Sequence, residues 1–186
     1  MTFEEVLDKL KSVYTFMPVG DMRVLYDYAK KVPRGGIILE VGTASGSSAF
    51  IMALASKPSC LIFTIDPVAN PNFFRDREEL KLKEKVRFFH NTSSEVIEWW
   101  DKRVDLIFID GLHNYEGVTT DIGGFVKWLK QGGFVIIHDY SLYRNTIGTA
   151  VDDAITKGQI TKIELVDNMC DKGVVGIFIG KRGSNI

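Results

Sequence analysis

Two motifs that contain aspartate and histidine each follow an apolar run of the chain. Asp110 ends the run VDLIFID and His113 follows three residues later, whereas His138 and Asp139 end the run GGFVIIHD. If the two runs are neighbouring parallel strands, both aspartates lie at the same edge of a sheet. Two adjacent carboxylates repel one another, and a shared divalent cation such as Mg²⁺ or Mn²⁺ would relieve the repulsion. We predict a metal site at Asp110 and Asp139, with helix capping or loop binding by each aspartate as the alternative.

The histidines of these motifs are candidates for proton transfer and metal binding. His113 stands at the mouth of the predicted site, and an imidazole with its ordinary pKa of about 6.5 suits a general base at neutral pH. His138 and Asp139 are consecutive, and consecutive side chains of a strand point to opposite faces. Both can face the site only if the strand ends before them. On that condition His138 is a third candidate metal ligand.

A glycine-rich turn lies earlier in the chain, between an apolar run and a helical pattern. Residues 40–46 read EVGTASG, in which Glu40 precedes the turn and Gly42 and Gly46 enclose it. Both glycines permit a positive φ and remove Cβ from the surface, so the backbone can approach a ligand closely. A P-loop would need a lysine here, and a dinucleotide fingerprint would need a further glycine. The turn favours another kind of ligand, unless it is a plain connection between strand and helix.

An acidic residue follows the next apolar run. Asp66 ends the run CLIFTID, 20 residues beyond Gly46. A carboxylate at this place can accept hydrogen bonds from two vicinal hydroxyls of a ribose. We predict that Asp66 binds a ribose, with a role in a turn or helix cap as the alternative.

The elements that must position these motifs follow from the hydrophobic pattern. Five apolar runs predict buried strands, at residues 36–41, 61–66, 86–90, 104–110 and 133–138. Helical patterns separate or follow them, at residues 47–56, 73–83, 94–100, 115–130 and 145–157. Two helices precede the first strand, at 3–16 and at 21–32 with Asp21 as its cap. This alternation predicts a parallel sheet with right-handed crossovers.

The end of the chain has a different pattern. Two strands at 162–167 and 173–180 are joined by the short connector 168–172, so they must pair antiparallel. We predict the α/β class, with a Rossmann-like, mostly parallel sheet of seven strands and a C-terminal antiparallel hairpin. The chain is expected to form a single domain, with N-terminal helices in 1–33, a core in 34–180 and a tail in 181–186.

Composition argues against several classes of protein. The 23 Lys and Arg against 24 Asp and Glu give a net charge of −1, which does not support sequence-independent binding to nucleic acid. No apolar run approaches the roughly 20 residues that span a bilayer. Cys60 and Cys170 cannot form a disulfide framework or a zinc ribbon. We expect a cytoplasmic protein that binds neither nucleic acid nor membranes.

The motifs resemble those of known enzymes. EVGxxxG resembles motif I of class I S-adenosylmethionine-dependent methyltransferases. FIDGLHNYE and GGFVIIHDY resemble the small-molecule O-methyltransferases of the macrocin type, which are related to the metal-dependent catechol type. The resemblance covers about residues 35–145. Two positions depart from the pattern, because His138 stands where some relatives have an acidic ligand and Tyr140 where the catechol type has asparagine.

The resemblance implies an activity and a set of site residues. It implies methyl transfer from S-adenosylmethionine to a hydroxyl of a small molecule, with Asp110 and His113 catalytic and His113 as the base. It implies Mg²⁺ or another divalent cation at Asp110 and Asp139, and a homodimer, which is common among relatives. The residues implied to bind the cofactor are Glu40, Gly42, Thr43, Gly46, Asp66, Asn91, Ser93 and Asp110.

Two other classes of function stay open from the sequence. His113, His138 and Asp139 could supply the two histidines and one carboxylate of a metal-dependent oxygenase or hydroxylase. Alternatively, the chain could be a domain that binds the cofactor without catalysing a reaction.

Overall fold

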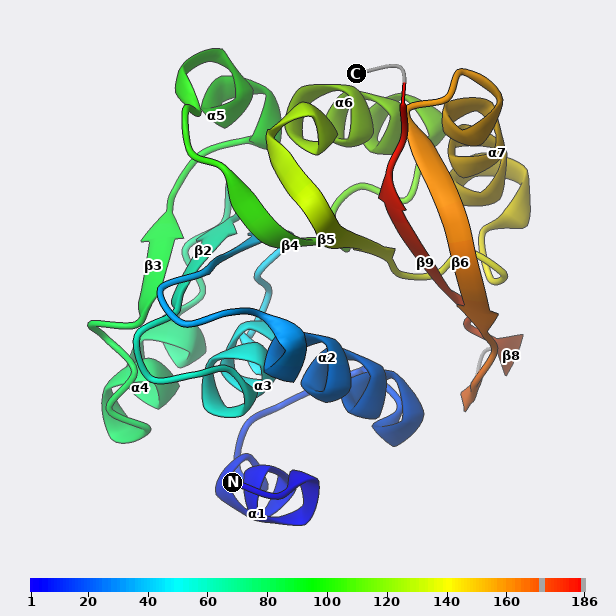
Figure 1. The fold of residues 1–186 in the computed structure, drawn as a ribbon. Coiled ribbons are helices and arrows are strands. Elements are labelled where there is room, and N and C mark those ends of the chain that lie inside the picture. Colours follow the sequence, from blue (N-terminus) through cyan, green and yellow to red (C-terminus); the bar gives the residue numbers. More distant parts are fainter. Residues whose placement is uncertain (171–172, 185–186) are drawn as a thin grey trace.

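A single sheet of seven strands organises the protein in the computed structural model, which describes residues 1–170 and 173–184 (Figure 1). The strand order is β3-β2-β1-β4-β5-β9-β6. Strands β1 to β5 pair in parallel, and β9 pairs antiparallel with both β5 and β6. The strands are β1 Ile37–Val41, β2 Leu61–Ile65, β3 Val86–Phe89, β4 Val104–Ile109, β5 Leu129–Ile137, β6 Ile160–Val166 and β9 Ile177–Arg182. The predicted Rossmann-like sheet with a C-terminal antiparallel hairpin is confirmed.

Helices cover both faces of the sheet (Figure 1). On one face lie α1 Phe3–Lys9, α2 Val19–Lys31, α3 Ser47–Ala55 and α4 Pro71–Glu79. On the other lie α5 Ser93–Trp99, α6 Tyr115–Phe125 and α7 Thr149–Thr156. A 3₁₀ turn, Val126–Trp128, follows α6, and a π turn, Arg144–Gly148, precedes α7.

Alternate residues of each strand face opposite helical layers. In β4, Leu106 and Phe108 pack with the layer of α1 to α4, whereas Ile107 and Ile109 pack with the layer of α5 to α7. All four are almost completely buried. Because both faces of the strand are covered, β4 is apolar along most of its length. The polar residues that follow each strand are thereby left at its carboxyl end.

The N-terminal helices differ from the expected ones at their ends. The side chains of Thr2 and Glu5 form a capping box that begins α1, but α1 ends at Lys9 instead of residue 16. Leu10 and Val13 are buried although they lie beyond the helix. The apolar spacing over residues 3–16 therefore indicates which residues are buried and does not indicate that the helix continues. The second helix begins at Val19 after Pro18, and Asp21 is therefore not its cap.

The C-terminal hairpin is interrupted by a small additional one. Strands β7 Met169–Cys170 and β8 Gly173–Val174 pair with each other, so β9 starts at residue 177 and not at 173. The tail expected from residue 181 starts later, because β9 continues to residue 182. Residues 171–172 of the predicted connector and 185–186 of the predicted tail lie outside the described residues. The helix predicted over 115–130 ends at residue 125, and β5 begins at 129.

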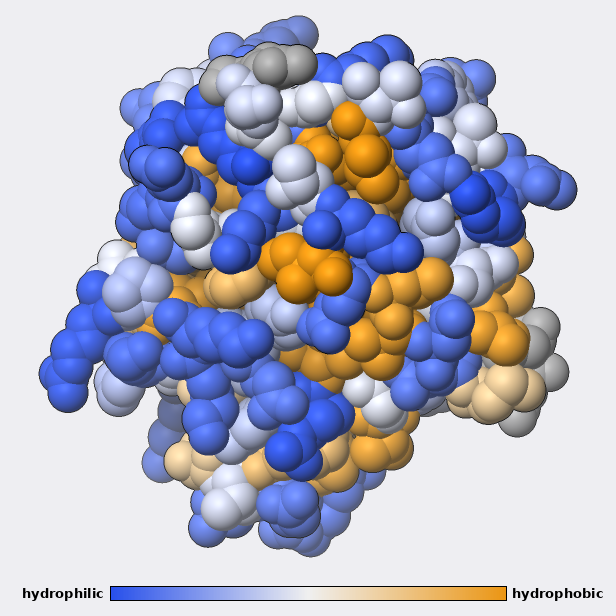
Figure 2. Space-filling view, turned by 45° about the vertical axis from the view of Figure 1, so that its right-hand side comes forward, coloured by the Kyte–Doolittle hydropathy of each residue, from blue (hydrophilic) through white to orange (hydrophobic). Residues whose placement is uncertain are grey.

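The surface of the described chain mixes hydrophilic and hydrophobic residues. On the face drawn in Figure 2, hydrophobic residues gather near the middle and hydrophilic residues border them. Among the large apolar side chains, Phe16 and Met169 are 83% and 73% exposed. Among the described residues, no helix combines the length and the apolar character needed to cross a bilayer.

Candidate functional site

The glycine-rich turn after β1 packs on a buried carboxyl group. Glu40 is completely buried and accepts hydrogen bonds from the hydroxyls of Ser48 in α3 and Thr64 in β2. Burial raises the pKa of Glu40 to about 8, although the two hydrogen bonds oppose the shift. Glu40 thus holds the turn from its buried side, because its hydrogen bonds link β1 to α3 and β2. Any effect of Glu40 on a bound cofactor would pass through the turn.

Two glycines let the turn pack tightly against its neighbours. Gly42 has a φ of +94°, and a Cβ at this position would lie 2.1 Å from the backbone oxygen of Asp110. Gly46 has a φ of +91° and precedes α3, and a Cβ there would lie 2.5 Å from the ring of Phe73. A side chain at either position would force the backbone or the ring to move. The contact at Gly42 places the turn directly beside the loop that follows β4.

Asp66 follows β2 and binds the same turn. Its Oδ2 accepts hydrogen bonds from the backbone N–H groups of Thr43 and Ala44, at 2.9 and 3.0 Å. Its Oδ1 accepts one from the N–H of Val68, at 2.8 Å. A carboxylate oxygen has two lone pairs, so one on Oδ1 is left for a ligand. The hydroxyl of Thr43 is buried against Thr64, 2.5 Å away, and so helps to hold the turn from inside.

Asn91 and Ser93 follow β3 at the same edge of the sheet. The helix cap is Thr92, which forms a capping box with Glu95, so Ser93 does not serve as the cap of α5. The amide of Asn91 lies 3.5 Å from the carboxylate of Glu95. Ser93 instead hydrogen-bonds to Asp121 of α6, and burial, which this hydrogen bond opposes, raises the pKa of Asp121 to about 6. Roles of Asn91 and Ser93 beside an adenine stay predictions.

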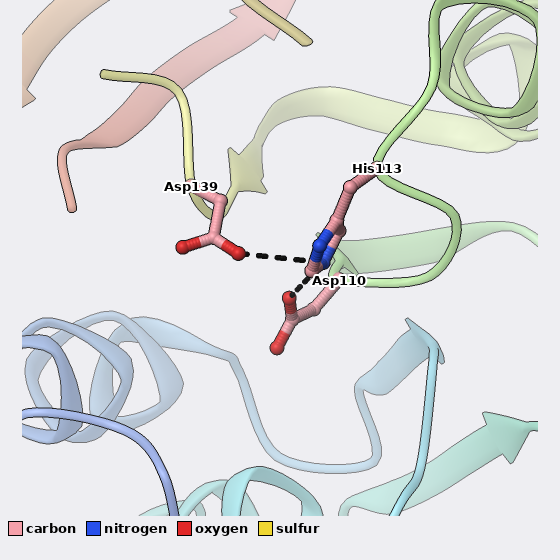
Figure 3. Close-up of side chains that lie close together, drawn as sticks. All are labelled: Asp110, His113 and Asp139. Carbon is pink, nitrogen blue, oxygen red and sulfur yellow. Dashed lines mark ion pairs between the residues drawn. The ribbon is translucent and has the colours of Figure 1, made fainter. Parts of the chain in front are cut away.

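The carboxyl ends of β4 and β5 bring Asp110, His113 and Asp139 together. Figure 3 shows His113 between the two aspartates, with its Nε2 3.6 Å from Asp110 Oδ1 and 3.3 Å from Asp139 Oδ2. One ligand atom from each residue lies within 4.8 Å of the others, so the three could hold a metal ion. The side chain of His113 is 37% exposed, and its ring packs on that of Tyr143.

His138 and Asp139 both face this cluster because β5 ends at Ile137. Asp139 has a φ of +59°, in the left-handed region, so the chain turns immediately after His138. Nδ1 of His138 lies 3.3 Å from Asp110 Oδ1 and 3.4 Å from Asp139 Oδ1. The condition set for His138 as a metal ligand is met. Tyr140, by contrast, points away and donates a hydrogen bond to Asp152 of α7 at 3.1 Å.

One residue of this site, Asp21 of α2, is not predicted from the sequence as a site residue. Asp21 is completely buried, and its Oδ2 lies 2.9 Å from Nε2 of His138. The sequence contains a signal that Asp21 is buried, because Asp21 shares helical spacing with Leu25 and Tyr28. All three side chains are buried on the same helix. An acid on the apolar face of a helix needs a partner inside the protein.

The charges of the cluster depend on one another. Burial alone would lower the pKa of His138, but the charge of Asp110 and the nearby carboxylates of Asp110, Asp139 and Asp21 raise it to about 12. The carboxylate of Asp110, which accepts from the ring of His113, raises the pKa of His113 against a smaller opposing effect of burial. Burial would raise the pKa of Asp110, but the charge of His138 and the ring nitrogens of both histidines beside its carboxylate lower it. The two histidines, when protonated, therefore balance the negative charge of the aspartates in this cluster.

The sequence matches a family model and curated relatives. The family model, described as a methyltransferase domain, matches residues 39–140, which is more than half of the chain. Uncharacterized protein R132 of Acanthamoeba polyphaga mimivirus is 28% identical over 120 residues, or 57% of this chain and 52% of that protein. The chain therefore spans about half the length of this relative.

Solved structures share the fold at low sequence identity. The O-methyltransferase TomG from Streptomyces achromogenes, solved in complex with SAM, is 14% identical with a TM-score of 0.77 over 98% of this chain and 89% of its own. An O-methyltransferase from Bacillus cereus in complex with SAH is 16% identical, with a TM-score of 0.72 over 97% and 90%. An rRNA methylase from Streptococcus thermophilus is 11% identical, with a TM-score of 0.71 over 92% and 100%. With the match of the family model, the chain belongs to the methyltransferase-domain family and has a Rossmann-like methyltransferase fold.

Proposed function

We propose that this protein transfers a methyl group from S-adenosylmethionine to a hydroxyl of a small molecule, assisted by a divalent cation. The observation that carries the proposal is the contact between Gly42 and Asp110. It joins the glycine-rich turn to the cluster of Asp110, His113 and Asp139 at one edge of the sheet, where open α/β folds bind ligands. A cofactor at the turn would lie next to groups able to bind a cation and accept a proton.

The cofactor proposal rests on the family and on the shape of the turn. When bound, S-adenosylmethionine supplies a methyl group on a positively charged sulfur. Gly42 and Gly46 would let it approach the backbone, and the free lone pair on Asp66 Oδ1 would accept one hydrogen bond from its ribose. Asn91 and Ser93 would lie along its adenine. The SAM and SAH bound in two neighbours of the same fold support this choice.

The donor atoms around Asp110 fit a divalent cation. Nδ1 of His138 is buried and has no hydrogen-bond partner, although it lies close to one carboxylate oxygen each from Asp110 and Asp139. Asp110, Asp139 and His138 would hold the cation, which when bound lowers the pKa of a nearby hydroxyl. His113 in its neutral form would take the hydroxyl proton, and the two aspartates beside its Nε2 would stabilise the resulting imidazolium.

The proposed acceptor is a small molecule and not a nucleic acid. A net charge of −1 supplies no cationic field for a phosphate backbone, although an RNA-modifying enzyme shares the fold. We also propose that the protein is cytoplasmic and does not bind membranes.

We further propose that the protein is a homodimer. A dimer interface could cover apolar side chains such as Phe16 and Met169, which are exposed in the single chain. Chromatography with light scattering would show twice the chain's mass of 20.9 kDa.

Transfer of a labelled methyl group tests this function. The full chain is incubated with tritiated S-adenosylmethionine and a panel of phenols, catechols and sugars, with Mg²⁺ or Mn²⁺ and again with EDTA. For an acceptor that is methylated, Asp110→Asn and His113→Gln should each lower kcat by about 10²–10⁴-fold. Asp27→Asn, which alters an exposed carboxylate of α2 paired with Arg23, is the matched control. Full turnover in His113→Gln would contradict the role of His113 as the base. Turnover that EDTA leaves unchanged would contradict the role of the divalent cation.

A further inference from the structure

We infer that Asp21 is a positioning residue that holds the ring of His138 with Nδ1 toward the cation site, so the site offers a nitrogen ligand. The inference rests on the proposed function, because it concerns the cation assigned there to Asp110, Asp139 and His138. It goes further by assigning a role to a residue of α2 and by naming the class of cation. Zn²⁺ or Co²⁺ should bind in preference to Mg²⁺.

Asp21 is fixed on both of its carboxylate oxygens. Oδ2 faces Nε2 of His138 at 2.9 Å, and Oδ1 accepts a hydrogen bond from the side-chain amide of Asn168. A Cβ at Gly20 would lie 2.2 Å from Oδ1 of Asn168, so the glycine leaves room for Asn168 to reach α2. Three separate parts of the chain therefore meet here: α2, the end of β5 and the loop after β6.

This arrangement decides which nitrogen of His138 can bind a cation. An ionised carboxylate only accepts hydrogen bonds, so Nε2 of His138 must carry the hydrogen that faces Asp21. Because the pKa of His138 is raised, Nδ1 also carries a hydrogen in the metal-free chain, and a bound cation displaces that proton and takes the lone pair of Nδ1. Nδ1 is buried without a hydrogen-bond partner and lies between Asp110 and Asp139. A carboxylate behind a ligating histidine commonly fixes the ring in this way and raises the affinity for the metal.

A nitrogen ligand changes the expected cation. Carboxylate and water ligands suit Mg²⁺, whereas imidazole suits Zn²⁺ and other transition metals. With His138 in the ligand set, and with Nε2 of His113 3.3 Å from Asp139, the site combines imidazole and carboxylate groups. The ligand set thus favours Zn²⁺ or Co²⁺ over the Mg²⁺ or Mn²⁺ that the sequence analysis names first.

The nitrogen signals of the histidine rings test the inference in the unmodified protein. The chain has three histidines, so a ¹⁵N-labelled imidazole spectrum is simple, and His138→Gln assigns the signals of His138. With saturating Zn²⁺, His138 should keep the hydrogen on Nε2 and show Nδ1 bound to the metal. A His138 signal that Zn²⁺ leaves unchanged, or Zn²⁺ on Nε2, overturns the inference.

Metal affinities of variants give a second test. Asp21→Leu should weaken Zn²⁺ binding by about 10–100-fold. Asp21→Asn should retain more affinity, because its amide oxygen can still accept the hydrogen of Nε2. Asp27→Leu changes an exposed carboxylate of the same helix and should leave Zn²⁺ affinity unchanged. His138→Gln should lower the preference for Zn²⁺ over Mg²⁺ at least about tenfold.

The outcomes separate this inference from the proposed function when S-adenosylmethionine is titrated into the same samples. Unchanged Zn²⁺ affinity in folded Asp21→Leu, with S-adenosylmethionine still bound, overturns the inference and leaves methyl transfer standing. Zn²⁺ on Nδ1 of His138 without binding of S-adenosylmethionine supports the inference and overturns the proposed function. A chain that binds Mg²⁺ but no Zn²⁺ overturns the inference alone, and a chain that binds neither ion also overturns the role of a cation. If Asp21→Leu does not fold, the spectrum of the unmodified chain decides.

Discussion

His138 and Asp139 show how one backbone angle can assemble a site. Consecutive strand residues point to opposite faces, yet both of these side chains approach Asp110 because β5 ends at Ile137 and Asp139 adopts a φ of +59°. Asparagine and aspartate tolerate this region better than most residues. The turn therefore gives the site two adjacent donors from a single strand end.

At Glu40, the raised pKa predicts that stability depends on pH. The folded chain keeps the proton of Glu40 up to a pH of about 8, whereas the unfolded chain loses it near the ordinary value of 4.5. Between these values the unfolded state binds fewer protons, so the free energy of unfolding falls as pH rises, by about 1.4 kcal/mol per unit. Glu40→Gln removes the titration.

Urea unfolding measures this effect from about pH 5 to about pH 8. The free energy of unfolding of the native chain, relative to Glu40→Gln, should fall by several kcal/mol over that range. A constant difference would show that Glu40 is already ionised in the folded protein.

Gly42 allows a second prediction at the scale of one residue. Gly42→Ala places a Cβ 2.1 Å from the backbone oxygen of Asp110 at a φ of +94°. The strained backbone alone should lower the free energy of unfolding by about 1–3 kcal/mol, and the overlap adds to this. The matched control is Gly123→Ala in α6, where a Cβ meets nothing within 4 Å. An alanine in this helix should stabilise it by up to about 1 kcal/mol. Equal unfolding midpoints of the two variants would contradict the assigned contact.

At the scale of elements, α2 links the core to the site. Leu25 is completely buried one turn beyond Asp21, so packing of the helix also holds Asp21 against His138. Leu25→Ala should lower the free energy of unfolding by about 2–5 kcal/mol. Arg23→Ala, on the exposed side of the same helix, should change it by less than about 1 kcal/mol. Similar losses in both variants would contradict the buried face assigned to α2.

The order of the elements could be predicted from the sequence, but several of their ends could not. Continuous apolar runs such as 104–109 identify strands covered on both faces, and β4 agrees with its prediction to one residue. Apolar spacing identifies burial without showing where a helix stops, so the sequence predicts a first helix that continues past Lys9, where α1 ends. Asp21 was interpreted as a cap because an acid near a helix start usually has that role. Its partner, His138, is 117 residues away and is reached only in the folded chain.

For the whole molecule, strand order determines where the motifs meet. β1 lies between β2 and β4, so the turn after β1 is next to both Asp66 and the loop of Asp110. Parallel strands direct these motifs to the same edge of the sheet. The sequence could therefore predict that Asp110 and Asp139 converge. It could not predict the contribution of α2, because the packing of the N-terminal helices is set by contacts distant in sequence.

The most direct test of the account is calorimetric titration of the full chain with S-adenosylmethionine, with and without the divalent cation. We predict saturable binding of one cofactor per chain, weakened at least about tenfold by Gly42→Ala and retained in Gly123→Ala. Binding should persist in Asp110→Ala even where methyl transfer is lost. No binding at millimolar cofactor would contradict the proposal that this chain is an S-adenosylmethionine-dependent methyltransferase.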